Sequence, residues 1–364
     1  MDIKILKALF ETPAPSASHN YVEFSEANED EKGFKAFFND RLLPKFGELE
    51  KSRSDHLKSM RSWLFKAVTP AFLWFLIGGI LLLVPAGHLA GLTDLQAMLQ
   101  EHHTVWYWLI IGLPLVITLI WFYVLAGSYQ NVVRDTLLPV FIGFFGKQWT
   151  ARRGGFKTDR LGNIQLIPEF VRYDEDYCIR GKYNDCNIEI VEINLTSREK
   201  PIALNRKNVS SARNRTAISF YGTVIALSVK QKLAGRIIGL GNAVRRNKIL
   251  PGVCKSKPME LDHISAPHEL AFHAASRDEA RRLIDDEFLT ELQVIGECLK
   301  DQNGRIRMDF EFAGDSLFLL FDGKTRAFEF PDLGDTLNQL ETYQRMIRLI
   351  SAVKRLSEKI NARD

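Results

Sequence analysis

The sequence predicts an α+β fold in which an N-terminal helix and a two-helix transmembrane hairpin precede a soluble domain with an antiparallel sheet and C-terminal helices. Two observations support this prediction. The first is a pair of long apolar runs at residues 63–85 and 105–127. The second is the order of segments after residue 151, where strand-like stretches are followed by a helix, a hairpin and another helix. That order is typical of an α+β domain rather than of a doubly wound sheet.

Each apolar run is long enough to cross a bilayer as a helix. A crossing helix needs roughly 20 apolar residues, and soluble helices are rarely apolar on every face over that length. The first run has one charged residue, Lys66, and the second has none. We therefore expect a transmembrane hairpin with a short external loop. A cleaved signal peptide, the rival interpretation of the first run, is disfavoured because a long charged segment precedes that run.

The flanks of the hairpin predict its orientation in the bilayer. Lys and Arg are frequent at residues 45–61 and 134–153, whereas the loop at residues 86–104 contains neither. Basic flanks mark the cytoplasmic side of a membrane protein, so we expect a multi-pass membrane protein with both termini in the cytoplasm and an external loop. The loop is periplasmic, and the membrane is the inner one, if the host is a Gram-negative bacterium. The boundaries that follow are a cytoplasmic N-terminal helical segment at 1–62, the transmembrane hairpin at 63–127, a juxtamembrane helix at 128–150 and a cytoplasmic α+β domain at 151–364.

Apolar spacing predicts the helices beside the hairpin. Six apolar residues recur at helical intervals within residues 29–62, which predicts a helix there. Pro44 predicts a kink or a split of that helix at Leu43. The apolar part of residues 128–150 is too short to cross a bilayer. We expect a helix that lies against the N-terminal helix, with a position in the lipid interface as the alternative.

Beyond residue 151, β-branched and aromatic residues alternate with polar ones, which predicts strands. The pair Asn184-Asp185 predicts a turn between two of these strands, and Ala313-Gly314-Asp315 predicts a turn in a later hairpin. The expected strands are residues 169–173, 176–183, 187–195, 217–229, 236–240, 259–264, 269–274, 305–313 and 316–322, and the expected helices are residues 277–300 and 336–362.

Charge and cysteine content narrow the class of protein. The formal net charge is +4, whereas nucleic-acid binding calls for a strongly basic face with a recognisable motif, so we expect no nucleic-acid partner. The cytoplasm keeps thiols reduced, so we expect free thiols rather than disulfides in the part of the chain placed there. That part contains all four cysteines, Cys178, Cys186, Cys254 and Cys298.

The sequence predicts no catalytic, cofactor-binding or metal-binding set. Residues 239–244 resemble the start of a dinucleotide fingerprint, but Val244 occupies the third glycine position, so a turn is favoured. The triplet Asp174-Glu175-Asp176 lacks the spacing of a calcium loop and is interpreted as an acidic turn ahead of a strand. No Ser/His/Asp or Cys/His arrangement is visible in the sequence, which favours a non-enzymatic function.

Two basic groups are the candidate contact residues. Near an inner leaflet that contains anionic lipid, each basic residue is worth about 1 kcal/mol of attraction. We expect these residues to contact anionic lipid headgroups or an acidic partner, with solvated loops as the alternative. They are Arg206, Lys207, Arg213, Arg215, Arg245, Arg246 and Lys248.

Four short motifs follow the predicted hairpin in a fixed order. They are Asp176-Tyr-Cys-Ile-Arg-Gly181, Ile190-Val-Glu192, Phe220-Tyr-Gly222 and Arg277-Asp-Glu-Ala-Arg281. With this order the chain resembles a bacterial family of uncharacterised two-span membrane proteins that have a C-terminal cytoplasmic domain of unknown function. The resemblance implies the architecture predicted above. That family has no established activity, so the resemblance implies no site residue.

The function that these observations favour is a membrane-anchored binding or scaffold module. Its expected partners are the lipid bilayer and either a protein or a second copy of the chain. A membrane-tethered enzyme with a dispersed active site and an oligomeric pore subunit are the alternatives. A cleft of perturbed titratable groups would favour the enzyme and a polar lumen the pore, whereas an exposed apolar or basic patch would favour the binding module.

Overall fold

The computed structural model divides the chain into two compact units, which are described in turn. The first unit comprises Met1–Glu23, Ala36–Leu137 and Phe330–Gln339, and the second comprises Phe24–Lys35, Leu138–Glu329 and Leu340–Asp364. The structure describes residues 8–9, 26, 29–83, 113–162, 164–167, 169–198, 216–241, 259–262, 264, 270–300, 304–305, 308–323, 326–331, 333–335, 337 and 340–362.

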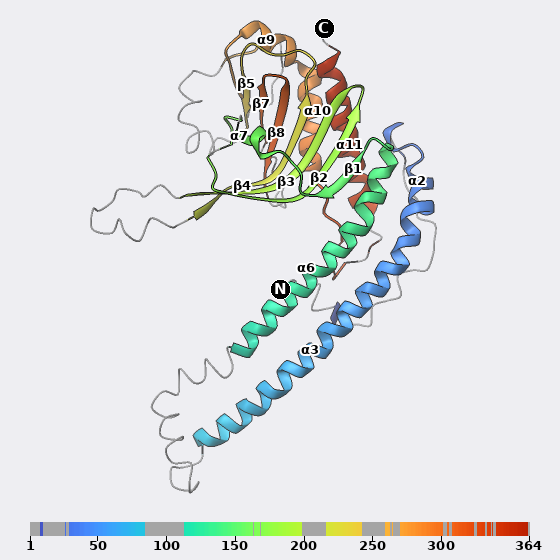
Figure 1. The fold of residues 1–364 in the computed structure, drawn as a ribbon, viewed down its shortest axis with the longest axis vertical. Helices are drawn as coiled ribbons and strands as arrows, with labels where there is room; N and C mark the ends of the chain where they lie inside the picture. Colours follow the sequence, from blue (N-terminus) through green and yellow to red (C-terminus); the bar gives the residue numbers. More distant parts are fainter. Residues whose placement is uncertain are drawn as a thin grey trace, which may run out of the picture. The chain divides into compact units, whose positions relative to one another are not determined.

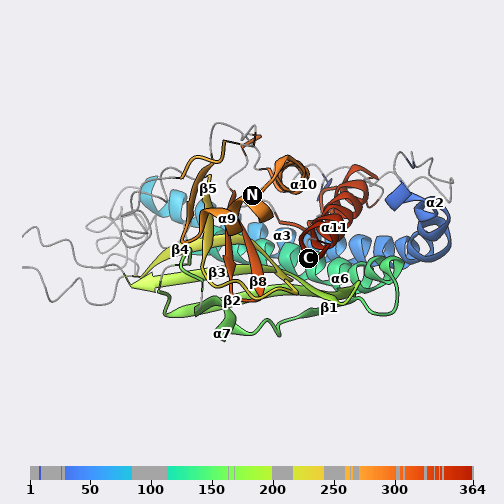
Figure 2. The same ribbon diagram turned by 90° about the horizontal axis from the view of Figure 1, so that it is seen from above.

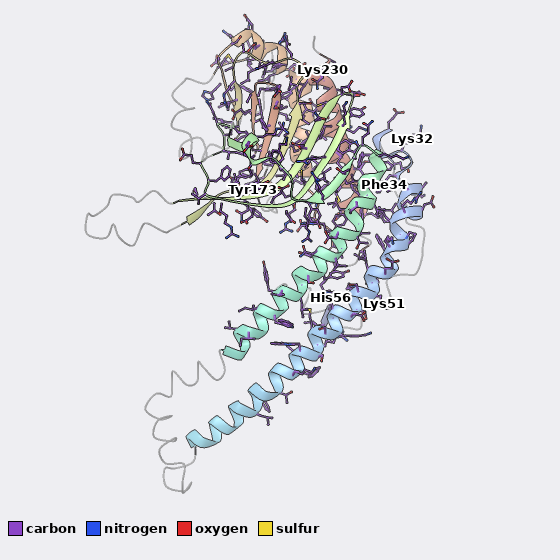
Figure 3. All side chains as sticks on the ribbon, viewed as in Figure 1. Lys32, Phe34, Lys51, His56, Tyr173 and Lys230 are labelled. Atoms are coloured by element: carbon purple, nitrogen blue, oxygen red, sulfur yellow. The ribbon has the colours of Figure 1, made fainter. Side chains whose placement is uncertain are left out.

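Two long helices make up most of the first unit as described (Figure 1). They are α3 (Leu43–Leu83) and α6 (Leu113–Ile142), and the last residues of α6 belong to the second unit. The rings of His56 and Tyr129 lie 5.6 Å apart, and those of Trp63 and Trp121 stack at 5.6 Å (Figure 3 labels His56). The residue number on α6 falls as the number on α3 rises, so the two helices run antiparallel.

Buried side chains recur at helical spacing along both helices. Arg53 lies within the buried stripe of α3, and its guanidinium donates to Glu50 Oε2 at 2.5 Å and to the carbonyl oxygen of Asp335 at 3.5 Å. These acceptors compensate the burial of its charge. The apolar members of the stripe are Phe46, Leu49, Leu57 and Met60 on α3, and Tyr129, Val133 and Leu137 on α6.

The helix widens immediately before Pro44. α2 (Phe34–Phe37) is followed by the π-helical turn η2 (Phe38–Leu42), and α3 begins at Leu43. The N–H of Leu43 donates to the carbonyl oxygen of Phe38, five residues back. Pro44 has no N–H to donate, so a break in the regular hydrogen-bond ladder at this point has a local cause. The helix is not split at Leu43, because Phe37 and Leu43 both have right-handed helical backbone angles and the helical residues follow one another without a gap. The irregularity that Pro44 predicts is this π-helical turn.

The predicted juxtamembrane helix is the continuation of α6. After Ile142 the chain forms one 3-10 turn, η4 (Gly143–Phe145). In the second unit the ring of Phe34 lies 5.8 Å from that of Phe141 and 5.1 Å from that of Phe144. Because Phe34 opens the N-terminal helix, the expectation that this segment lies against the N-terminal helix is confirmed at these rings.

An antiparallel sheet forms the body of the second unit (Figures 1 and 2). In the described residues it has eight strands in the order β1-β2-β3-β4-β8-β7-β5-β6. The sheet and the helices that follow it confirm the predicted α+β class. The strands are β1 (Thr150–Arg153), β2 (Arg172–Tyr183), β3 (Cys186–Arg198), β4 (Thr216–Ser228), β5 (Ile237–Leu240), β6 (Ala271–Ala274), β7 (Met308–Ala313) and β8 (Ser316–Asp322).

Two helices cover one face of this sheet, namely α10 (Asp286–Cys298) and α11 (Leu340–Asn361) (Figure 2). The ring of Phe288 on α10 lies 5.4 Å from Phe310 and 5.7 Å from Phe312, both on β7. The Glu291 carboxylate of α10 accepts from Arg355 Nε of α11 at 3.1 Å, which ties the two helices together. We call this side of the sheet the helix face.

A short irregular segment covers the opposite face (Figure 2). It contains the helix α7 (Thr158–Gly162) and packs apolar side chains against alternate residues of the central strands. Because both faces of the sheet are covered, apolar residues occupy both faces of the central strands rather than every second position. The main members of this cluster are Phe156, Leu161, Ile164 and Leu166 from the segment, and Val191, Ile193, Phe220, Val224, Phe318 and Leu320 from the strands.

The structure corrects several predicted boundaries. The two strands expected at residues 169–173 and 176–183 form one strand, β2, with a register shift between Glu175 and Cys178. In place of the strand expected at residues 259–264, the described residues form one isolated bridge, from Met259 to Phe272. β1 begins at the last residue of the segment predicted as a helix. It was not predicted as a strand because its sequence, TARR, has no apolar alternation.

The helix predicted over residues 277–300 is two helices. α9 (Arg277–Leu283) ends before the extended residues Ile284 and Asp285, and α10 then begins. The Asp285 side chain accepts from the N–H of Phe288 at 2.8 Å. This N-cap stabilises a new helix start that the continuous apolar spacing concealed.

The predicted turn at Asn184-Asp185 is confirmed. The φ angles of these residues are 46° and 64°, and they connect Tyr183 to its partner Cys186. Two consecutive left-handed residues define the type I′ turn, whose twist matches that of paired strands. Asn and Asp tolerate this conformation better than most residues do, so the local sequence specifies the turn between β2 and β3.

Gly239, the first glycine of the partial dinucleotide fingerprint, lies within β5 and not in a turn. A β-carbon at this position would approach Phe310 Cε1 of the neighbouring strand to 2.1 Å. The glycine therefore makes room for an aromatic ring of the core. The residues of the fingerprint after Gly241 lie outside the described residues.

We expect Gly239→Ala to lower the free energy of unfolding by about 1–3 kcal/mol, since the added methyl overpacks the core. Gly143→Ala is the control, because a β-carbon there has no atom within 4 Å. Thermal melting of the detergent-solubilised protein measures both variants. Equal melting temperatures for Gly239→Ala and the wild type would contradict the packing role.

The cysteines that the structure describes are buried free thiols, namely Cys178, Cys186 and Cys298. Burial raises the pKa of Cys178 to about 12 and that of Cys298 to about 11. The pKa of a cysteine thiol in an unfolded chain is about 8.5. The folded state therefore keeps these protons to higher pH than the unfolded chain does. The free energy of unfolding falls as the pH rises from about 8.5 toward the raised pKa values of the folded thiols.

Because the thiolate is the nucleophile, we expect a maleimide at neutral pH to leave Cys178 and Cys298 unmodified in the folded protein. A Cys254→Ser background removes the remaining cysteine, which lies outside the described residues. Mass spectrometry after labelling, with and without denaturant, measures the modification. Rapid labelling of Cys178 without denaturant would contradict its burial.

Candidate functional site

The basic residues proposed from the sequence as lipid or partner contacts, seven positions from Arg206 to Lys248, all lie outside the described residues. The acidic triplet Asp174-Glu175-Asp176 is described, and its interpretation as a turn ahead of a strand is wrong. It lies within β2, where Asp174 pairs with Asn194 of β3. The register of β2 shifts between Glu175 and Cys178, so Asp176 lies within the irregular part of the strand, and all three acidic residues line a polar pocket.

This pocket has a volume of about 250 Å³ and lies in the second unit. Three adjacent strands and the chain that follows β8 form its wall. The lining residues are Asp174, Glu175, Asp176, Glu192, Ile193, Asn194, Tyr221, Gly222, Thr223, Gly323 and Arg326.

Strand register brings the polar side chains of the pocket together. Asp174 pairs with Asn194, and Asn194 pairs with Tyr221, which makes one row across three strands. Glu192 pairs with Thr223 in the next row. Directly paired residues share a face of the sheet, and so do residues two apart on one strand. Both rows therefore lie on one face, which is the helix face.

Gly222 lies between these two rows on β4. A β-carbon there would approach the carbonyl oxygen of Phe321, on the neighbouring strand β8, to 1.9 Å. The N–H of Gly323 donates to the carbonyl oxygen of Tyr221 at 2.9 Å, just beyond the paired strands. The backbone of β4 and the end of β8 can approach this closely because Gly222 has no side chain.

Arg326 is the cation of the pocket. Its Nη1 atom lies 3.4 Å from Asp176 Oδ2, with both side chains about one-third exposed. Burial lowers the pKa of this guanidinium, but a side-chain hydrogen bond to Tyr221 and the charge of Glu192 outweigh burial, and the net pKa is raised. Arg326 thus remains charged and draws the carboxylates toward the end of β8.

Glu192 is 7% exposed and is held by the backbone beyond Arg326. Its Oε1 atom accepts from the N–H of Phe328 at 3.1 Å. A buried carboxylate is stable only where hydrogen bonds or a cation compensate it. The backbone N–H of Phe328 and the nearby guanidinium of Arg326 provide that compensation, so Glu192 fixes the chain after β8 against the sheet.

The side chain of Glu175 is engaged outside this set. Its carboxylate accepts from the N–H of Phe156 at 3.0 and 3.1 Å and from the hydroxyl of Tyr173 at 2.8 Å (Figure 3 labels Tyr173). Burial, together with this hydrogen bond, raises the pKa of Tyr173 above its usual value. Glu175 therefore holds the segment that contains α7. The remaining carboxylates of the pocket are those of Asp174, Asp176 and Glu192.

The buried polar atoms of the pocket include Thr223 Oγ1 and Asn194 Oδ1, which have no hydrogen-bond partner among the described residues. Thr223 as a whole is 1% exposed. Most buried polar side-chain atoms are hydrogen-bonded, so each exception calls for an explanation such as a ligand or a water. Both atoms belong to the two rows that line the pocket.

The chemistry of this arrangement is that of binding a donor-rich group. Three carboxylates, one amide and two hydroxyls line the pocket together with one guanidinium, and Arg172, outside the lining, pairs with Asp174 at 3.0 Å. Acceptors are therefore in excess among the described lining residues, and Asp176 and Glu192 share the one lining cation. Within the described part of the chain, no group of three or more His, Cys, Asp or Glu residues is arranged to hold a metal ion.

A second surface feature lies in the first unit. Within the two apolar runs, large apolar side chains are exposed along the described parts of α3 and α6, at fractions from 42% for Trp121 to 83% for Tyr123, and Val132 farther along α6 is 37% exposed. Contiguous exposed apolar surface marks a site of interaction with lipid or another molecule. The residues are Phe65, Phe72 and Leu73 on α3, and Val116, Ile117, Ile120, Trp121, Tyr123 and Val124 on α6.

All nine of these residues fall within the two apolar runs of the sequence. Among the residues that the structure describes, no helix has both the length and the apolarity needed to cross a bilayer.

Comparison with known proteins identifies no family for this chain. No protein-family model and no curated protein matches it. Among solved structures, it is similar to the crystal structure of the mycobacterial trehalose monomycolate transport factor A, with 11% sequence identity and a TM-score of 0.25. The match covers 58% of this chain and 80% of that chain. A likeness of this size carries no argument about fold or function.

The contact between Glu192 and Phe328 can be tested by substitution. We expect Glu192→Ala to lower the free energy of unfolding by about 1–3 kcal/mol, since the buried N–H of Phe328 loses its acceptor. Glu192→Gln keeps a side-chain oxygen that can accept, so its loss is expected to be smaller. Chemical denaturation in detergent measures both variants, and an equal loss for the two would contradict the role of this hydrogen bond.

Proposed function

We propose that this chain is a bilayer-anchored binding module. In this proposal the hairpin of α3 and α6 inserts into the inner membrane of a bacterium, and the α+β unit binds a ligand in the cytoplasm through the pocket on its helix face. The observation that carries the proposal is the set of nine large apolar side chains exposed on α3 and α6.

Lipid is the occupant that best suits this surface. The exposed residues belong to runs of 23 residues that together contain a single charged side chain, Lys66. A soluble partner would need a complementary apolar surface of the same length, whereas hydrocarbon solvates every face of such a helix. Basic residues flank both outer ends of the hairpin and are absent from residues 86–104, which supports cytoplasmic termini.

The pocket supports binding rather than scaffolding alone. Its charged groups are held by hydrogen bonds and strand pairing before any ligand is present, and Thr223 Oγ1 and Asn194 Oδ1 have no hydrogen-bond partner in the described part of the chain. Pre-organised polar groups in a small cleft are the usual basis of ligand recognition. The family of two-span membrane proteins that the sequence resembles has the same order of parts.

Substitution on α6 tests the anchor. Ile120 and Val124 are 59% and 52% exposed and lie one turn apart on one face. We expect the double variant Ile120→Asp/Val124→Asp to be lost from carbonate-washed membranes, because each Asp in hydrocarbon costs about 2.5–3.5 kcal/mol. The control is Ser128→Asp/Asn131→Asp, at exposed polar positions of the same helix, which is expected to remain membrane-bound.

Immunoblots of the washed membranes and of the soluble fraction measure the distribution. Retention of the double Asp variant at the wild-type level would overturn the anchor, and so would release of the wild-type chain by carbonate. A reporter fused at Asp364 tests the orientation. A reporter that works only in the cytoplasm is expected to be active, and activity of one that works only outside the cytoplasm would reverse the proposed topology.

A further inference from the structure

The pocket on the helix face has two properties that together point to one class of ligand. The first is its charge. Asp176 and Glu192 face a single cation, Arg326, among the described lining residues, whereas Asp174 is paired with Arg172 at 3.0 Å. Carboxylates gathered in a partly enclosed space repel one another unless positive charge joins them. The pocket is therefore electrostatically suited to a cation.

The second property is a pair of buried atoms that have no hydrogen-bond partner among the residues that the structure describes. Thr223 Oγ1 and Asn194 Oδ1 can both accept hydrogen bonds, and Thr223 is 1% exposed. These atoms are diagonal neighbours, since Asn194 lies two residues from Glu192, the direct partner of Thr223 on β4. A ligand that donates to both would remove the penalty of two unsatisfied buried groups.

We infer that this pocket binds a primary ammonium group. An ammonium group has three donors, no acceptor and a compact positive charge. Thr223 Oγ1, Asn194 Oδ1 and the carboxylate of Glu192 are three acceptors from adjacent positions on β3 and β4. A volume of about 250 Å³ holds a short alkyl-ammonium chain, below the usual range for larger ligands.

Two features argue against the other cations. A metal ion calls for a set of several ligands, and the described residues contain no group of three that could hold one. A guanidinium group is planar and calls for bidentate partners, whereas the two unpartnered acceptors here belong to separate side chains on adjacent strands. The ammonium group comes either from a free amine or from a lysine side chain of a peptide.

The inference rests on the proposed binding function and is tested apart from membrane anchoring. The full chain in detergent micelles is titrated calorimetrically with putrescine, with Nα-acetyl-lysine amide, and with Nα-acetyl-norleucine amide, which has the alkyl chain but no ammonium group. We expect saturable binding of one or both amines and none of the norleucine compound. Binding of the lysine compound alone identifies a peptide source, and binding of putrescine alone identifies a free amine.

Two variants locate the binding. Thr223→Val removes the unpartnered hydroxyl with little change of shape, and Glu192→Gln removes one charge. Each is expected to raise the Kd for the bound amine by about tenfold or more, since one hydrogen bond to a charged donor is lost or weakened. Glu297→Gln, at a half-exposed position on α10, removes the same charge elsewhere and is expected to leave the Kd unchanged.

Thermal melting separates lost binding from lost folding. The hydroxyl that Thr223→Val removes has no hydrogen-bond partner within the described ranges, so this variant is expected to melt no lower than the wild type. Absence of amine binding, equal binding of the norleucine compound, or wild-type affinity in both variants would overturn the inference. A chain that is released from membranes by carbonate but still binds the amine would overturn the anchor and leave this inference standing.

Discussion

The pairing of β3 with β4 is the constraint on which the second unit depends. These strands pair from Ile188 with Leu227 to Arg198 with Thr216, and both faces of each strand are covered. Side chains alternate with a period of two, so a slip of one residue would bring Val191 and Ile193 to the helix face and Glu192 into the apolar cluster. Burying an unpaired carboxylate there would be strongly unfavourable, so one register sets the core and the pocket together.

The two units offer surfaces of opposite chemistry. The described helices of the first unit expose apolar side chains, while the pocket of the second unit offers carboxylates, an amide and a hydroxyl. Removal of an exposed apolar surface from water lowers the free energy. Hydrogen bonds donated to the unsatisfied acceptors of a polar pocket lower it as well. In the proposed function, a membrane anchor that bears a ligand-binding domain, one chain combines both stabilising contributions.

Much of the fold follows from local signals in the sequence. The alternation of apolar and polar residues identified most strands of the sheet, and Asn184-Asp185 specified the turn between β2 and β3. Pro44 marked the π-helical turn before α3. These features depend on neighbours in the sequence, and so sequence reasoning could find them. β1 was missed because its four residues, TARR, show no apolar pattern.

The pocket could not be predicted from local sequence patterns. Its residues come together only through strand pairing and through the chain that follows β8. Asp174 to Asp176 looked like a turn because acidic runs are uncommon in strands. Glu192 and Thr223 are single polar residues in apolar strands, and their pairing is not visible in the sequence. A polar residue in a strand that is otherwise apolar was the available signal. Arg326 joins them from more than a hundred residues away along the chain.

The widened turn at Phe38–Leu42 has a mechanical consequence for everything that follows it. A π-turn accommodates one residue more than an α-helical turn, and each residue advances a regular helix by about 100°. Removing one residue there would rotate the whole of α3 by that amount about its axis. The buried apolar stripe of α3 would then face away from α6. A few residues at the start of this helix therefore set its rotation about its own axis.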